Sequence, residues 1–296
     1  MNTSRLPPGL SNLGNTCYLN ALLQVLYGGL INSNRNQTSI TDVNPRNKSL
    51  GKKFDNLCKA INVVQEEKGN RLRSLSPVTL LRAIQTNTTV PILRQRGRQQ
   101  DAHELLLLLL DSSHVLRNTT RFNFTSVLSS ESEISCTDWT SYHMSLKLGP
   151  SITSMLHEDL CCHDTLSNGA TKSICITSVP SLLLIHIRRW HPRTRSKLGT
   201  AVVINGTIKV PVHCKSNLKC TIEKNSPERR IRYEVFELVG IVHHFGSSVR
   251  SGHYVADVKS SQWFHCNDSR VTRQNQCPEN RGSCTAYICA YKRRSK

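Results

Sequence analysis

The sequence is poor in aromatic and in acidic residues. Phe, Trp and Tyr make up 5% of the 296 residues, and 20 Asp and Glu stand against 39 Lys and Arg, for a formal charge of +19. Surfaces that bind nucleic acid by stacking interleave basic with aromatic side chains, so the sparse aromatics argue against such a surface. Two interpretations of the charge stay open: a solvated basic surface that aids solubility, or a surface for an anionic partner such as nucleic acid.

Long apolar runs are also missing. The longest obvious run, Leu105 to Leu110, is far shorter than the roughly 20 residues that cross a bilayer. Residues 1–8 contain no apolar segment typical of a secretory signal. We therefore expect a cytoplasmic or nuclear protein without membrane contact, whose 12 cysteines are thiols rather than disulfides. We also expect a monomer.

Hydrophobic residues make up 38% of the chain, enough for one domain with a sizeable core. Apolar residues at helical spacing predict helices over 50–64, from 80–81 onward and over 105–110. Alternating or continuous apolar stretches predict strands, which we place at 181–189, 207–212, 233–243 and 252–258. Residues 191–206 and 213–230 are polar and basic and are predicted to be loops.

A cysteine stands at the start of a predicted helix in residues 9–20 (GLSNLGNTCYLN). Leucines recur at helical spacing after Cys17, and Gly28-Gly29 predict the end of the helix. Unpaired N–H groups and the dipole at a helix start favour a thiolate over a thiol. We therefore expect a lowered pKa for Cys17 and a nucleophilic role, the alternative being an ordinary buried cysteine.

A thiol nucleophile needs an imidazole base and a polar group that orients it. His253 follows Gly252 at the head of a predicted strand, and a turn at 259–262 leads into a second strand that ends in Asn267-Asp268. Such a hairpin places an Asn or Asp oxygen beside the histidine, where it can fix the tautomer of the ring. The sequence therefore predicts a Cys–His–Asn or Cys–His–Asp arrangement.

Three blocks of sequence together resemble the catalytic domain of a ubiquitin-specific protease, a papain-like cysteine peptidase of family C19. They are residues 9–26, residues 99–104 (QQDAHE) and residues 233–268, followed by a terminal strand at 286–291. The resemblance implies an α+β fold with thumb, palm and shortened, degenerate fingers. It also implies a single domain over 1–296, with a helical thumb (1–116), reduced fingers (117–180) and a β-rich palm (181–296).

The resemblance also implies residue roles. Cys17 is expected to be the nucleophile, His253 the general base and Asn267 the orienting residue, with Asp268 as its neighbour and alternative. Asn12 is expected to line the oxyanion hole together with the backbone N–H of Cys17. Two further asparagines are weaker candidates for that hole: Asn15, which also fits a helix cap, and Asn20, which also fits a solvent-facing helix position.

Substrate-binding residues are inferred from the basic tail of ubiquitin. Asp101 and Glu104 are expected to contact that tail, although acidic residues in a first helical turn are also ordinary capping residues. Gly252 and Tyr254 flank the histidine and are assigned to the same side of the site, although packing also accounts for Tyr254. Residues 246–252 resemble a loop over the tail, which is compatible with an ordinary hairpin connection.

Zinc is not expected, because the paired cysteines that hold it in many relatives survive only as remnants. A rearranged set stays as an alternative: Cys136, Cys161, Cys162 and His163. No cofactor is expected. The implied function is hydrolysis of the isopeptide bond after the C-terminal glycine of ubiquitin, through an acyl-enzyme on Cys17, with ubiquitin and ubiquitinated proteins as partners. The alternatives are a catalytically weak binder of ubiquitin or a related modifier, and a basic scaffold that associates with nucleic acid.

Overall fold

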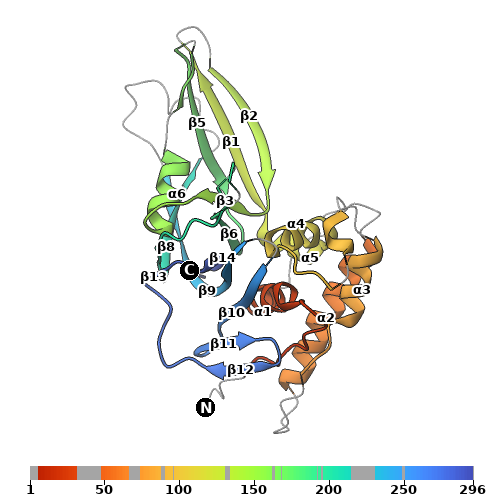
Figure 1. Cartoon of the computed structure of the whole chain (residues 1–296). Helices are drawn as coiled ribbons and strands as arrows, with labels where there is room; N and C mark the ends of the chain where they lie inside the picture. Colours follow the sequence, from red (N-terminus) through yellow and green to blue (C-terminus); the bar gives the residue numbers. More distant parts are fainter. Residues whose placement is uncertain are drawn as a thin grey trace.

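The structure is a computed structural model in which α-helices, a four-stranded sheet and an eight-stranded sheet form a mixed α/β arrangement (Figure 1). The residues that it describes are 6–31, 48–66, 74–87, 91–95, 97–130, 134–161, 164–167, 169–191, 193–194, 196–214, 231–248 and 251–295. Among these residues, no helix is both long and apolar enough to span a membrane.

The helices lie mainly in the first 120 residues. They are α1 (Cys17–Ile31), α2 (Lys48–Glu66), α3 (Val78–Asn87), the 3₁₀ helix η2 (Pro91–Arg94), α4 (Ala102–Ser112), α5 (His114–Thr120) and α6 (Ile152–Cys161). The predicted helices at 50–64, 80–81 and 105–110 are confirmed as α2, α3 and α4. The helix after the cysteine begins at Cys17, as predicted, but its predicted end at Gly28-Gly29 is wrong, because α1 continues through both glycines to Ile31.

The strands form two main sheets. In spatial order the four-stranded sheet contains β2 (Ile134–Ser141), β1 (Phe122–Ser129), β5 (Thr171–Ser178) and β4 (Asp164–Thr165). The eight-stranded sheet runs β12 (Arg270–Arg273), β11 (Trp263–Asn267), β10 (Ser251–Lys259), β9 (Ile231–Ser248), β14 (Ala286–Arg293), β6 (Leu182–Arg188) and β3 (Met144–Lys147), with β8 (Thr207–His213) paired to β9. A separate pair joins β7 (Val202–Ile204) to β13 (Arg281–Ser283).

The predicted strands are confirmed as β6, β8, β9 and β10, and residues 259–262 connect β10 to β11 as expected. Two details differ from the sequence expectation. β7 lies inside the predicted loop 191–206, and β3, from the region expected to form the fingers, pairs in parallel with β6 of the large sheet. Both strands are short and are defined by partners distant in sequence, which local patterns do not reveal.

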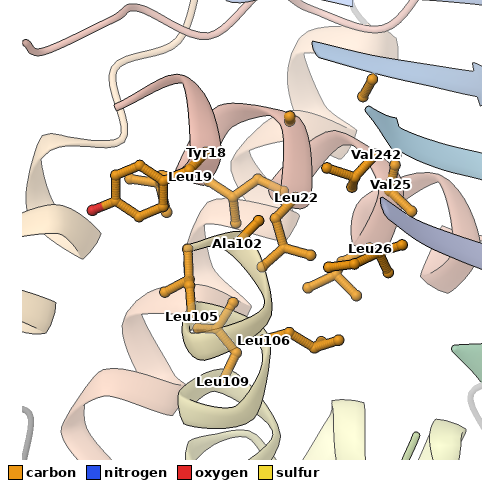
Figure 2. Packing of buried hydrophobic residues seen from close by; sticks show 14 of the residues in the cluster. Tyr18, Leu19, Leu22, Val25, Leu26, Ala102, Leu105, Leu106, Leu109 and Val242 are labelled. Atoms are coloured by element: carbon orange, nitrogen blue, oxygen red, sulfur yellow. The ribbon is translucent and has the colours of Figure 1, made fainter. Parts of the chain in front are cut away.

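Helix α1 lies between the large sheet and α4 (Figures 1 and 2). Leu19, Leu22 and Leu26 of α1 belong to the same buried cluster as residues of α4 such as Leu105 and of β9 such as Val242. Burial of a leucine contributes roughly 1.5–3 kcal/mol. This packing on both sides fixes the amino end of α1, and with it Cys17, relative to the strands.

Gly29 permits close approach of α1 to the large sheet and does not end the helix. A Cβ at this position would lie 2.7 Å from Cδ1 of Leu182, a fully buried residue at the start of β6, whereas a Cβ at Gly28 would meet only Val258 at 3.8 Å. We expect Gly29→Ala to lower the free energy of unfolding by about 1–3 kcal/mol through overpacking. Gly28→Ala is the matched control and should be neutral or stabilising by up to about 1 kcal/mol. Urea unfolding of both variants measures the difference, and equal stabilities would contradict this account.

Three histidines meet where the helices and the two main sheets join. His103 of α4 stacks on His186 of β6 with ring centroids 3.6 Å apart, and its Nε2 lies 3.2 Å from Nε2 of His143, which precedes β3. Ser145 Oγ lies 2.8 Å from Nδ1 of His186. The Nε2···Nε2 contact is a hydrogen bond only while at least one of the two rings lacks a proton on that atom. His103 therefore joins α4 to β6 and to the segment that precedes β3.

Acidification is expected to weaken this junction. Burial lowers the pKa of His103 from 6.5 to about 4, and it also lowers the pKa of His143 and of His186, next to which Arg188 adds positive charge. Between pH 6.5 and 4, His103 therefore binds a proton in the unfolded protein but not in the folded protein. The folding free energy that depends on neutral His103 is fully present above pH 6.5 and is lost as the pH falls toward 4. The loss is on the order of 3 kcal/mol for His103 alone. Urea unfolding from pH 7 to pH 4 should give a shallower pH dependence in His103→Gln than in the parent protein, and parallel curves would contradict this assignment.

Candidate active site

Cys17 is the first residue of α1 and is almost completely buried, with 4% of its surface exposed. The helix starts here because the carbonyl of Thr16 accepts the first turn of hydrogen bonds, from the N–H groups of Leu19 and Asn20. Just before it, Asn15 adopts a left-handed backbone conformation with φ of 53°. The chain thus turns sharply and enters the helix with the thiol at its amino end.

The expected lowering of the Cys17 pKa is wrong. Burial raises the pKa of the thiol above its ordinary value of 9.0, and the nearby carboxylate of Asp268 acts in the same direction. Backbone N–H groups of Tyr254 on β10 and of Tyr18 and Cys17 at the helix start stabilise the thiolate, but they do not offset these two effects. The raised pKa favours the thiol over the thiolate in the free protein, so the reaction needs a base that removes the proton.

The imidazole of His253 is presented by the β9–β10 hairpin and held by β11. Its Nε2 lies 2.8 Å from Oδ1 of Asn267. Because an amide oxygen only accepts, Nε2 carries the hydrogen of this bond and Nδ1 is left with a free lone pair. The backbone N–H of the next residue, Tyr254, stabilises the thiolate form of Cys17, and α1 packs against β10, the strand that carries His253.

Asn267 and Asp268, which the sequence left as alternatives, contact different partners. Asp268 has φ of 51°, a conformation that turns its side chain away from His253 and toward the segment preceding α1. One carboxylate oxygen accepts a hydrogen bond of 2.8 Å from the amide of Asn12, and the other accepts one of 2.8 Å from the amide of Asn20. Asn267 alone of the two is bonded to the imidazole.

The side chain of Asn12 is fixed at both ends. Its Oδ1 accepts from the backbone N–H groups of Gly14 at 3.0 Å and Thr16 at 3.2 Å, while its Nδ2 donates to Asp268. An amide nitrogen has two hydrogens, so Asn12 retains one for a further acceptor near the start of α1. Asn15, the weaker candidate, donates instead to the carbonyl of Gly97 at 2.8 Å.

Asn20 is the residue whose position was not expected. The interpretation as a solvent-facing helix residue is wrong, because only 1% of its surface is exposed. Its amide reaches the carbonyls of Leu10 and Ser11 at 3.3 Å in addition to Asp268. The available signal was a polar pair, Asn20 and Gln24, one turn apart on an otherwise apolar helix, which predicts buried polar contacts on that face.

The segment before α1 crosses between two distant parts of the chain. The N–H of Leu10 donates to the carbonyl of Asp268 at 2.9 Å. On the other side, the carbonyl of Gly9 accepts from Leu75 at 2.8 Å, and the N–H of Ser11 donates to the carbonyl of Leu75 at 2.9 Å. A Cβ at Gly9 would lie 2.2 Å from the carbonyl oxygen of Ser269, so only glycine fits this approach to the β11–β12 turn.

Asp101 caps α4 and is not free in this structure. Its Oδ1 accepts from the backbone N–H of His103 at 2.8 Å, and the hydroxyl of Tyr287 lies 2.9 Å from both carboxylate oxygens. Burial raises the pKa of this carboxyl above its usual value of 3.8. The capping interpretation is thus confirmed, and contact with a substrate stays a prediction for Asp101. Glu104, in the first turn of the same helix, is exposed.

The two residues that flank His253 differ in their surroundings. Gly252 has φ of 139°, and a Cβ there would lie 2.1 Å from the carbonyl oxygen of Phe245 on β9, so the hairpin needs glycine next to the histidine. Tyr254 is buried, with its ring 4.5 Å from that of His244. Packing therefore accounts for Tyr254, and a substrate contact for either residue is untested.

Within the described part of the chain, no three His, Cys, Asp or Glu side chains are arranged to hold a metal ion. Cys136 lies exposed on β2, while Cys162 and His163 fall outside the described residues. The rearranged zinc set is therefore not tested. Each cysteine whose state is described is a free thiol.

A thiol lies at the start of a buried helix, and this helix packs against a sheet that carries a histidine–asparagine pair. This arrangement defines the class of papain-like cysteine peptidase folds. Two solved structures share the fold: the SAGA DUB module Ubp8/Sgf11/Sus1/Sgf73 bound to monoubiquitin, with a TM-score of 0.71, and the same module bound to ubiquitin aldehyde, with a TM-score of 0.69. Both have 20% sequence identity, and the match covers 99% of this chain and 71% of theirs. Residues 8–291 match the ubiquitin carboxyl-terminal hydrolases, and the chain belongs to this family.

Curated relatives carry the same family name. Ubiquitin carboxyl-terminal hydrolase 12 of Saccharomyces cerevisiae is 32% identical over 130 residues, which cover 43% of this chain and 10% of the relative. Ubiquitin carboxyl-terminal hydrolase 25 of Arabidopsis thaliana is 27% identical over 324 residues, which cover 90% of this chain and 44% of the relative. The matched region thus spans less than half of the length of these relatives.

Proposed function

We propose that this protein is a deubiquitinase that hydrolyses the bond after the C-terminal glycine of ubiquitin through a thioester on Cys17. The observation that carries the proposal is the hydrogen bond of 2.8 Å from Nε2 of His253 to Asn267, since it leaves Nδ1 as a base beside the helix that starts at Cys17. Family membership over residues 8–291 and a fold shared with ubiquitin-bound structures support ubiquitin as the substrate.

Acylation begins with proton transfer. Nδ1 of His253 takes the thiol proton of Cys17, and the sulfur bonds to the carbonyl carbon of the terminal glycine, whose oxygen becomes negative. The imidazolium then gives its proton to the leaving lysine amine as the carbon–nitrogen bond breaks, which leaves a thioester. The raised pKa of Cys17 fits this order of events, because the proton moves during the reaction rather than before it.

Deacylation repeats these steps with water. His253 removes a proton from water, the hydroxide oxygen bonds to the thioester carbon, and the sulfur leaves and regains a proton from the imidazolium. The backbone N–H of Cys17 and the remaining N–H of Asn12 are the donors that we assign to the oxyanion in both steps. Loss of one such donor typically raises the barrier by about 3–4 kcal/mol.

On the substrate side, Glu104 is the freer of the two acidic candidates for the ubiquitin tail, because Asp101 is engaged by His103 and Tyr287. An anionic or nucleic-acid partner for the basic surface stays a prediction, as do the monomeric state and the cytoplasmic or nuclear location.

The test is a set of modifier proteins with a C-terminal electrophile. We expect covalent capture of the ubiquitin probe and release of fluorophore from ubiquitin linked to a fluorogenic amine. Capture of a related modifier but not of ubiquitin would indicate that the related modifier is the substrate. Ubiquitin binding without capture or turnover would favour the catalytically weak binder, and neither binding nor capture would favour the basic scaffold.

A further inference from the structure

Asn20 is a buried amide one helical turn after Cys17 that touches neither the thiol nor the imidazole. Its Nδ2 lies 2.8 Å from Oδ1 of Asp268 and 3.3 Å from the carbonyls of Leu10 and Ser11. A buried amide that donates to a carboxylate makes a strong, charge-assisted hydrogen bond. Asn20 therefore connects α1 to the β11–β12 turn directly behind the candidate active site.

The carboxylate of Asp268 is shared between two amides. Asn20 binds Oδ1, and Asn12 binds Oδ2, each at 2.8 Å. A carboxylate rotates about one bond, so a hydrogen bond to one oxygen also fixes the direction of the other oxygen. The direction of the Asp268 carboxylate therefore depends on both amides.

We propose that Asn20 is a positioning residue that acts through Asp268 to fix the amide of Asn12. Without Asn20, the carboxylate turns toward other donors, and the remaining N–H of Asn12 loses its fixed direction toward the oxyanion. This inference rests on the proposed function, because it assigns a further residue to the same reaction. A misplacement of a transition-state donor lowers kcat more than it weakens substrate binding.

A purely structural explanation of Asn20 makes a different prediction, and Gln24 supplies the comparison. Gln24 lies one turn further along α1, has 2% of its surface exposed, and donates from Nε2 to the carbonyl of Pro8 at 2.6 Å. Both amides thus tether the segment before α1 to the helix. Of the two, only Asn20 has a hydrogen bond to Asp268 among the described contacts.

The experiment compares Asn20→Leu with Gln24→Met, two replacements of similar size that lack the amide. We expect Asn20→Leu to lower kcat on ubiquitin linked to a fluorogenic amine by roughly 10–100-fold, with KM within about twofold of the parent value. Gln24→Met should keep kcat within about threefold. An unchanged kcat in Asn20→Leu, or equal losses in the two variants, would overturn the proposal.

A second comparison tests whether the effect passes through Asp268. In Asp268→Ala, the further change Asn20→Leu should not lower kcat again, and additive losses would overturn the proposal. If the parent protein has no turnover, the proposed function fails by that result alone. In that case, thermal unfolding is compared for the parent protein, Asn20→Leu, Asp268→Ala and the double variant. Non-additive shifts of the unfolding midpoint support the coupling of Asn20 to Asp268, and additive shifts overturn it. Thermal unfolding also shows whether Asn20→Leu is folded.

Discussion

Replacement of Cys17 with alanine should abolish both turnover and covalent capture of ubiquitin probes. The sulfur is the atom that forms the thioester, and the neighbouring residues Thr16, Tyr18 and Leu19 contain no second thiol. Removal of the nucleophile from a covalent protease lowers kcat by about 10⁶-fold. Ubiquitin affinity should stay within a few-fold of the parent value, because alanine keeps the helix start intact. Active-site titration and calorimetry measure the two quantities.

The control for this variant is Cys136→Ser, on the exposed edge strand β2. Cys136 is accessible to small alkylating reagents but lies on the four-stranded sheet, on a different element from α1. Capture by the ubiquitin probe should be unchanged in Cys136→Ser. Capture that persists in Cys17→Ala would remove Cys17 from the reaction and, with it, the proposed mechanism.

Replacement of His253 with alanine should lower kcat by about 10²–10⁴-fold, the usual contribution of a general base. A large effect is expected here because burial raises the pKa of Cys17, which disfavours loss of the thiol proton in the absence of a proton acceptor. Steady-state kinetics with the fluorogenic substrate measure the loss. The double variant Cys17→Ala/His253→Ala should be no less active than Cys17→Ala, because residues that act in one step are not additive.

His265 is the matched control for His253. It lies on β11, two residues before Asn267, and its Nδ1 bonds to Asp257 at 2.8 Å rather than to the asparagine. Asp257 also receives bonds from His243 and Gln274, which hold the pKa of this carboxyl far below its usual value. His265→Ala should therefore keep kcat near the parent value. A similar loss in both histidine variants would indicate a general disturbance of the hairpin and contradict the assignment of His253 as the base.

Much of this architecture is readable from local sequence. The start of α1 at Cys17, the β10–β11 hairpin and the strands β6, β8 and β9 follow from apolar periodicity and turn residues, which report on the chain within a few positions. The predicted helix end at Gly28-Gly29 was wrong because a glycine pair, judged from local sequence alone, resembles a helix end. In the fold, the distant residue Leu182 requires Gly29 for close packing, and the buried helix tolerates the lower propensity.

Some features of the candidate site cannot be predicted from local sequence patterns. The residue pair Asn267-Asp268 is visible in the sequence, but the two residues have different hydrogen-bond partners because Asp268 has a φ of 51°. This dihedral angle cannot be predicted from one sequence. The direction of the Cys17 pKa shift was wrong for a similar reason. A helix start is a local feature that lowers this pKa, whereas burial depends on how α4 and the large sheet close over α1.

Gly9, Leu10 and Ser11 are held by Leu75 on one side and by the β11–β12 turn on the other, so the segment before α1 is fixed only once residues far later in the chain have been made. A nascent chain that contains Cys17 but not yet Asp268 has the thiol but lacks the residues that we assign to its reaction. Peptidase activity would then appear only after the chain has been translated beyond Asp268. A chain released before that point would carry the cysteine without the peptidase activity.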